Sequence, residues 1–593
     1  MLLAFLAACP APDDTAAEAL GGALGLGRQN PFPSVELIGE DGHLALREGD
    51  LPVKEGGIPW DFTPFARREG FSVVQPSVVL FDVPLDTASV GGPESIATDG
   101  TVRLVDLDTG ETLWCFAELD AAPEALASGL RPLIVRPMKA LTPGHRVAVV
   151  VTSGVTSGGQ PLDVPAPEGH YAELHAELAA LGQDDVVLAW DFPVARGNAL
   201  LDAVLSATAV TPGAPTWTRE WDADVEGTEP PAGLWKLAQG TLPTQNLLVD
   251  ENHMELDADG VPAAQGTGNA YLMVAVPESV RDAAPGTVPV LLFGHGILSD
   301  PSDYLRADDD ESGLVAFANE MGAIVVATEW RGLGGEDRLH AIEVAGEFSR
   351  FDEMPQMLAQ GVADNVALLA AVREGTLMDE PIFGGLADRT QVSYYGISLG
   401  GIEGAVMLAN QDVVERGVLH VGGAAWSTML ERSAQWPPFD LVVSRNFPDP
   451  FDRQVLYAAS QVLWDPVDPA TYAAELSTGQ WLWQEAIGDE QVPNLTTELL
   501  ARSTGATLGE PAVTTPPGVL SQAMPFSGIG FAQFDPQVAM PAPENRPAPI
   551  TDAHTIPRTW EGARAQAIHF YATGEVAHFC GTEPCSASNP GSF

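Results

Sequence analysis

The stretch that most constrains the fold of this chain is Gly396-Ile397-Ser398-Leu399-Gly400, which joins a short apolar run to a helix-like run. Residues 391–395 have the composition of a buried strand, and residues 402–408 have that of a buried helix. A serine at so sharp a turn is strained, and the strain is tolerable only between very small residues. Because both flanking positions are glycine, the pattern favours an exposed nucleophilic hydroxyl over a flexible loop.

The charge of the chain argues against several classes of partner. The 593 residues include 28 basic and 81 acidic ones, which gives a net charge of -53. Such a surface repels nucleic acids and anionic membranes, so neither is an expected partner. The length predicts two or three domains, and no apolar run in the sequence is long enough to span a bilayer.

The four cysteines fall into three different situations. Cys9 follows Leu6-Ala7-Ala8 in a sequence that resembles the lipobox of bacterial lipoproteins, although the apolar stretch is short and no basic residue precedes it. This resemblance implies a secreted or cell-surface bacterial lipoprotein, anchored to the outer membrane through an acylated Cys9. Cys580 and Cys585 are expected to form a disulfide, and Cys115 is expected to be a buried thiol. Their spacing matches no zinc pattern, so no metal and no cofactor are expected.

The chain divides into parts of different composition. Between residues 71 and 151, short apolar runs separated by Asp-Gly, Thr-Gly and Pro-Gly turns predict a β-sandwich, which resembles bacterial immunoglobulin-like modules. From residue 288, strands alternate with helices, which predicts an α/β domain with a mostly parallel sheet. The expected parts are a signal and lipobox remnant at 1–9, a flexible tether at 10–30, the sandwich at 31–165, a helical segment and connector at 166–246, and the α/β domain at 247–593.

Within the α/β domain the sequence predicts a strand before and after most helices. The helix expected at 360–373 directly precedes the serine strand. The expected strands are 288–293, 323–327, 391–395, 418–421, 481–487 and 567–571.

A serine hydroxyl is a poor nucleophile at neutral pH, so it needs a base, an acid that orients the base, and donors for an oxyanion. In serine enzymes with a strand–turn–helix nucleophile, the acid follows a later strand and the histidine follows the acid. Asp489 follows the expected strand 481–487, with Glu490 as its nearest competitor. An ordinary turn aspartate is the alternative interpretation.

Chain order leaves three of the eleven histidines as candidate bases: His554, His569 and His578. His569 lies inside the expected strand 567–571, where its side chain cannot easily reach the serine. His578 lies in the loop beyond that strand and is therefore the predicted base. The predicted disulfide would anchor this loop.

The oxyanion requires two backbone N–H groups. One is expected from Leu399, the residue after the serine. The other is expected from Ile297, because Gly294-His295-Gly296-Ile297 follows an early strand with residues small enough for close approach to a ligand. His295 precedes the serine and is interpreted as a structural loop residue.

Gly-His-Gly, Gly-x-Ser-x-Gly, Gly-Asp-x-x-Val-Pro and a C-terminal histidine, in this order, resemble the α/β-hydrolase superfamily across about residues 250–590. With the sandwich, the chain is similar to bacterial extracellular lipases of the virulence-factor type, including lysophospholipase lipoproteins. The resemblance implies an α/β-hydrolase catalytic domain that cleaves carboxylic esters through Ser398, His578 and Asp489. Long insertions on either side of Asp489 depart from a minimal hydrolase.

One of these insertions is rich in aromatic residues. Residues 426–483 contain five of the thirteen tryptophans. The segment 426–480 is predicted to be a lid that lines an acyl pocket, and a cap with its own small core is the alternative. The candidate pocket residues are His295, Trp330, Trp426 and Trp483.

Together these features predict a serine ester hydrolase of the lipase or esterase type, acting on lipid or other apolar esters through an acyl-enzyme. A polyester depolymerase or peptidase with the same three residues is an alternative within the enzymes. A surface binding protein with a degenerate hydrolase fold is an alternative from another class. The sequence does not indicate the oligomeric state.

Overall fold

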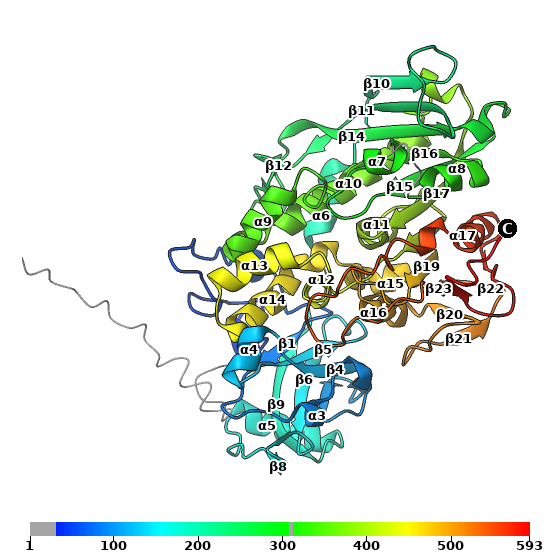
Figure 1. Cartoon of the computed structure of the whole chain (residues 1–593). Helices are drawn as coiled ribbons and strands as arrows, with labels where there is room; N and C mark the ends of the chain where they lie inside the picture. The colour runs from blue at the N-terminus through cyan, green and yellow to red at the C-terminus, as the bar shows by residue number, and fades with distance from the viewer. Residues whose placement is uncertain (1–30, 198, 211, 307–311) are drawn as a thin grey trace, which may run out of the picture.

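The computed structural model describes residues 31–197, 199–210, 212–306 and 312–593 (Figure 1). The predicted lipobox, with Cys9, and the predicted tether lie outside these ranges. Within them, no helix is both long enough and apolar enough to cross a membrane.

A sheet of twelve strands runs through the larger part of the described chain. Its central strands β16, β15, β17, β18, β19 and β23 are parallel neighbours, which confirms the predicted α/β class. In spatial order the strands are β10 (Thr216–Asp222), β11 (Leu234–Asn246), β14 (Gly266–Pro277), β16 (Ile324–Ala327), β15 (Val288–Gly294), β17 (Ala387–Ile397), β18 (Arg416–His420), β19 (Gln480–Ala486), β23 (Gly530–Asp535), β20 (Thr507–Glu510) and β21 (Ser521–Ala523), with β25 (Cys585–Ser586) beside β23.

Helices cover both faces of this sheet. Side chains alternate along a strand, so Leu291 and Phe293 pack in one hydrophobic cluster while Val290 and Leu292 pack in the other. The first cluster contains residues of α8 (Leu314–Met321) and α17 (Glu561–Thr573). The second contains residues of α10 (Glu353–Glu374), α11 (Leu399–Ala409) and α16 (Asn494–Thr504). Burial on both faces explains why the central strands are almost continuously apolar.

The N-terminal part contains two antiparallel sheets, with strand orders β1-β5-β4 and β3-β2-β6-β9. The assignment of this part to an immunoglobulin-like sandwich stays a prediction. The strands are β1 (Ser77–Val79), β2 (Val102–Asp106), β3 (Thr112–Leu113), β4 (Cys115–Leu119), β5 (Leu133–Pro137), β6 (Arg146–Thr152) and β9 (Val186–Pro193).

The structure differs from the sequence expectation between residues 166 and 246. Helices α5 (His170–Ala180) and α6 (Ala199–Thr208) are present, but β9 between them completes the four-stranded sheet. The expected connector instead forms β10 and β11, which extend the large sheet through β14. The predicted boundary at residue 247 therefore lies inside the region that builds this sheet.

Residues 567–571 are not a strand but part of α17. Ala563, Ala567 and Phe570 are buried at helical spacing, and a short apolar run cannot by itself distinguish a strand from a buried helix. The last central parallel strand is β23, which the sequence analysis did not predict.

Residues 426–479 are largely helical and lie between β18 and β19. In Figure 1, α13 and α14 lie between α9 and the N-terminal strands, consistent with contacts of α13 with α9 and of α14 with β1. The helices are α12 (Trp426–Leu430), α13 (Pro437–Asn446), α14 (Pro450–Trp464) and α15 (Ala473–Leu476), and α9 is Arg338–Gly346.

A buried ion network joins β4 and β5 to this helical insertion. Arg136, only 1% exposed, donates from Nε to Glu118 at 2.6 Å and from Nη2 to Glu431 at 2.7 Å. Arg432 pairs with the second oxygen of Glu118. Burial opposes the ionisation of Glu118, but Arg432 and Arg136 hold its pKa below the usual value. The network therefore keeps its charges only while both arginines are in place.

We expect Arg136→Ala to lower the free energy of unfolding by about 3–5 kcal/mol, because Glu118 and Glu431 would remain buried without it. Urea unfolding followed by tryptophan fluorescence measures the loss. Arg103→Ala is the matched control, since the side chain of its partner Asp185 is 44% exposed, and it should cost about 1 kcal/mol or less. Equal losses in the two variants would contradict the assignment.

Candidate active site

Ser398 lies at the junction of β17 and α11 in a strained conformation. Its φ is 57° and its ψ is -116°, an unusual combination for a residue with a side chain. A Cβ atom on Gly396 would lie 2.0 Å from the carbonyl oxygen of Gly400, and one on Gly400 would lie 2.2 Å from that of Gly294. Both flanking glycines are therefore required by close backbone contact, and this contact fixes the position of Ser398.

Two backbone N–H groups beside Ser398 are free to bind an oxyanion. Within the described part of the chain, neither Ile297 nor Leu399 donates its N–H to a protein acceptor. Leu399 is the first residue of α11, so no carbonyl of that helix is available to it.

The residues around these two donors are all engaged. Hydrogen bonds run from Gly296 N to Tyr304 Oη, from Leu298 N to Leu333 O, from Ser398 N to His420 O, and from Gly400 N to His295 O. The two residues predicted from the sequence are thus the ones whose N–H groups the fold leaves open.

Asp489 is hydrogen-bonded to His554 rather than to His578. Its carboxylate oxygens lie 2.7 and 2.9 Å from Nδ1 of His554, and both side chains are buried. The carboxylate also accepts the N–H groups of Gln491 and Val492, which fixes it at the carboxyl end of β19. Asp489 thus orients the histidine ring through Nδ1.

The other ring nitrogen of His554 is left unbonded within the described part of the chain. Its Nε2 is buried and has no partner among the described residues, and the hydroxyl of Ser398 is also without one there. Burial lowers the pKa of His420 to about 3, with smaller contributions that include the nearby His554. The carbonyl oxygen of His420 accepts the Ser398 N–H.

The predicted base His578 has different contacts. Its Nε2 lies 2.8 Å from the carbonyl oxygen of Glu583, in a partly exposed C-terminal loop. The expected disulfide between Cys580 and Cys585 is confirmed, but it anchors this loop and not that of His554. His569 lies on α17, with its Nε2 3.7 Å from Glu575.

The expected chain order kept His554 among the candidate bases. His578 was preferred because residues 567–571 were predicted to be the last strand, whereas they belong to α17. The true strand β23 ends at Asp535, and His554 lies in the long loop that follows it. Identification of β23 would have indicated His554 as the loop histidine.

Glu490, the competitor of Asp489, has a separate role. One of its oxygens accepts the Thr551 hydroxyl at 2.9 Å and the backbone N–H of His554 at 3.3 Å. Its side chain is fully buried. Neighbouring carboxylates therefore hold the ring and the backbone of His554.

His295 is structural, as the sequence indicated. Its Nε2 accepts the N–H of Trp330 at 2.9 Å, and its Nδ1 faces the carbonyl oxygen of Gly296 at 2.8 Å. Burial lowers its pKa to about 4, so the ring is neutral at pH 7. Its carbonyl oxygen accepts the Gly400 N–H and ties the loop to α11.

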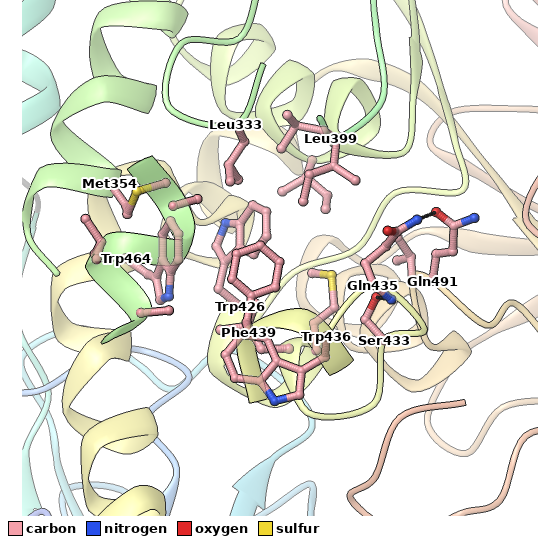
Figure 2. Close-up of a pocket in the computed structure, with 18 of the residues that line it drawn as sticks. Leu333, Met354, Leu399, Trp426, Ser433, Gln435, Trp436, Phe439, Trp464 and Gln491 are labelled. Carbon is pink, nitrogen blue, oxygen red and sulfur yellow. Dashed lines mark hydrogen bonds between the residues drawn. The ribbon is translucent and has the colours of Figure 1, made fainter. Parts of the chain in front are cut away.

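A cavity of about 90 Å³ adjoins Ser398 (Figure 2). Its lining is apolar except for Ser398, Ser433, Gln435 and Gln491, and no lining residue carries a formal charge. The lining residues are Ile297, Leu333, Ala341, Val344, Ala345, Phe348, Phe351, Met354, Ser398, Leu399, Ile402, Trp426, Met429, Leu430, Ser433, Gln435, Trp436, Phe439, Trp464, Gln491 and Val492.

Of the predicted pocket residues, only Trp426 lines this cavity. Trp330 and Trp483 are buried in the protein core, and His295 is buried and held by its own hydrogen bonds. Trp464 stacks on Trp426 with ring centroids 4.8 Å apart. The aromatic composition of the insertion was thus a better guide to the pocket than the individual tryptophans chosen.

No protein-family model matches the sequence, and no curated protein matches it. Among solved structures, acetyl xylan esterase 1 from Thermoanaerobacterium sp. JW/SL YS485 is similar at 15% identity and a TM-score of 0.35, over 57% of this chain and 88% of that one. An acylaminoacyl peptidase from Pyrococcus horikoshii matches at 16% identity and a TM-score of 0.29, over 58% and 48% of the two chains.

An esterase from the archaeon Pyrobaculum calidifontis matches at 15% identity and a TM-score of 0.29, over 51% of this chain and 79% of that one. Similarity at this level assigns no family. The function is therefore inferred from the geometry of the site.

Glu403 is a buried acid on α11, the helix that begins at Ser398. Both of its carboxylate oxygens are buried without a hydrogen-bond partner among the described residues. Burial raises its pKa well above 4.5, and negative charge on Asp468 adds to the effect. The folded protein therefore keeps a proton on Glu403 at pH values where the unfolded chain has released it.

Stability should consequently fall as pH rises above about 4.5, towards the folded-state pKa of Glu403. We expect Glu403→Gln to remove this contribution. The melting temperature of the variant, relative to that of the wild type, should therefore be higher at pH 8 than at pH 5. Differential scanning fluorimetry at both pH values measures the gain. Glu415→Gln, at an exposed position, should show no such gain. A constant difference between Glu403→Gln and wild type would refute the assignment.

Proposed function

We propose that this protein is a serine carboxylester hydrolase in which Ser398 is the nucleophile, His554 the base and Asp489 the residue that orients the base. The observation that carries the proposal is the strained Ser398 between two backbone N–H groups, of Ile297 and Leu399, that have no acceptor among the described residues. Two free donors beside a strained hydroxyl match the needs of a tetrahedral oxyanion. The Asp489–His554 pair supplies the base and the acid that orients it.

The mechanism proceeds through an acyl-enzyme. Nε2 of His554 takes the Ser398 proton as Oγ attacks the ester carbon, and the resulting oxyanion receives the N–H groups of Ile297 and Leu399. The alcohol leaves with the proton from His554. Water, deprotonated in turn by His554, then releases the acid and restores the Ser398 hydroxyl. Asp489 holds Nδ1 and stabilises the imidazolium in both halves of the reaction.

The cavity supports an apolar acyl group. Its walls are mostly aliphatic and aromatic, and burial of a methylene group there contributes about 0.8 kcal/mol. Asp468 fixes one wall, because its carboxylate accepts the N–H groups of Ala425 and Trp426 at the start of α12. We propose that residues 426–480 act as a lid over this acyl site.

The surface location remains part of the proposal. A lipoprotein of the virulence-factor lipase type would be acylated at Cys9 and exported. The disulfide between Cys580 and Cys585 is compatible with an oxidising compartment. Radiolabelled palmitate incorporation into the wild type, but not into Cys9→Ser, is the direct test of acylation.

Ser398→Ala is expected to lower the hydrolysis of p-nitrophenyl esters by about 10³-fold or more, since it removes the nucleophile. It should also abolish labelling by a fluorophosphonate probe. Circular dichroism and the melting temperature serve as folding controls. Retention of either activity or labelling in a folded variant would overturn the proposal.

The two histidines can be separated by matched substitutions. We expect His554→Ala to lower kcat by about 10³-fold or more, because Asp489 holds no other ring. His578→Ala should retain activity within a few-fold, because His578 contacts only the C-terminal loop. Stopped assays with p-nitrophenyl butyrate at a fixed pH compare the kcat of the two variants. A larger loss in His578→Ala than in His554→Ala would instead indicate His578 as the base.

A further inference from the structure

The cavity beside Ser398 has two chemically different ends. In Figure 2, Met354 and Trp464 lie at one end, and Ser433, Gln435 and Gln491 lie together at the other. Phe348 and Phe351 add stacked rings to the apolar lining, and Phe351 meets Trp464 edge to face. An acyl chain would therefore be buried at the first end, which leaves the second end for the other half of the ester.

The polar end is tied to the acid of the catalytic residues. Gln491 lies two residues after Asp489 and donates its backbone N–H to the Asp489 carboxylate at 2.8 Å. The N–H of Ala434, next to Ser433, bonds the carbonyl oxygen of Glu490 at 2.7 Å. The leaving alcohol must take its proton from His554, which Asp489 holds. The polar end thus lies on the side from which an alcohol departs.

The side chains at this end suit hydroxyl groups. Gln435 donates from Nε2 to Oε1 of Gln491 at 3.0 Å, which leaves the carbonyl of Gln435 and the amide N–H groups of Gln491 for a ligand. Ser433 adds a hydroxyl. Amide groups supply both donors and acceptors, and each hydroxyl of a ligand needs both.

Charged alcohols are disfavoured at this end. No lining residue carries a formal charge that could pair with a phosphate or an ammonium group. The net charge of -53 also opposes the approach of anions. A neutral alcohol with several hydroxyl groups is the complement that remains.

On the basis of the proposed hydrolase function, we propose that Ser433, Gln435 and Gln491 form a leaving-group subsite for an uncharged polyhydroxy alcohol esterified to an apolar acyl chain. Such an alcohol could come from glycerol or from a sugar. Both present adjacent hydroxyl groups to the same amides, so the substrate panel has to separate them.

The test compares four esters of the same octanoyl chain: 1-monooctanoylglycerol, 6-O-octanoylglucose, ethyl octanoate and 1-octanoyl lysophosphatidylcholine. The wild type should show a kcat/KM on the glycerol or glucose ester about ten-fold above that on ethyl octanoate. Whichever of the two is higher identifies the alcohol. Equal values for these esters and ethyl octanoate, or a preference for lysophosphatidylcholine, would overturn the subsite.

The variant Gln435→Leu/Gln491→Leu should lower the ratio of polyol ester to ethyl ester by about ten-fold. Gln391→Leu, at an exposed amide near the start of β17, is the matched control and should leave the ratio unchanged. Ala345→Phe, in the apolar lining, should instead shift chain-length preference equally for both esters. An unchanged ratio in the double variant would also overturn the subsite.

Failure of the subsite and failure of the proposed function give different results. If ethyl octanoate is hydrolysed and Ser398 is labelled by a fluorophosphonate, the hydrolase function stands even when the ratios show no preference. If no ester is cleaved and no labelling occurs, both proposals fail. Labelling of Gln435→Leu/Gln491→Leu verifies that the double variant retains its reactive serine.

Discussion

The backbone contact between Gly400 and Gly294 is the constraint on which the active site depends. It brings α11 against the end of β15 with no side chain between them, so Leu399 and Ile297 meet beside Ser398. The hydroxyl of Tyr394 adds a 2.6 Å hydrogen bond to the Gly400 carbonyl oxygen, which holds the helix start from the strand below. Ser398 and the backbone N–H of Ile297, which come from different elements, are thus positioned by a single contact. The strain at Ser398 is sustained because these surroundings are rigid.

Elements whose local pattern agrees with their final environment were predicted well from the sequence. The Ser398 turn, Asp489 at a strand end, and Ile297 after a glycine pair all follow from short-range rules. His554 was not predicted as the base, because the strand that precedes its loop, β23, lacks the apolar pattern by which a strand is recognised in a sequence. Gln533, in the middle of β23, is buried, and its amide donates to Glu485 and to Thr514. A polar residue satisfied only by distant partners interrupts the apolar run that sequence analysis seeks.

The same reasoning explains the errors in the N-terminal half. Strand β9 lies between two helices, and its role appears only through the pairing of Val149 with Trp190 on β6 and β9. Strand β10 lies at the edge of the large sheet and contains Arg219 and Glu220, and its neighbour β11 contains Lys236 and Pro243. Local composition resembled a connector in this region, and only the long-range antiparallel pairing with β14 shows that it is sheet.

The loop of His554 is fastened to the N-terminal part as well as to Glu490. Asn545, nine residues before the histidine, donates to Asp120 at 2.9 Å and accepts the N–H of Ala121 at 2.8 Å. The same Asn545 amide reaches Glu431, beside the helix that carries Trp426. The loop of His554 and the cavity wall at Trp426 are therefore braced against one polar junction outside the large sheet. The N-terminal sheets therefore support the loop of His554, so domain exchange or truncation would have to preserve Asp120 and its neighbours along with Ser398, His554 and Asp489.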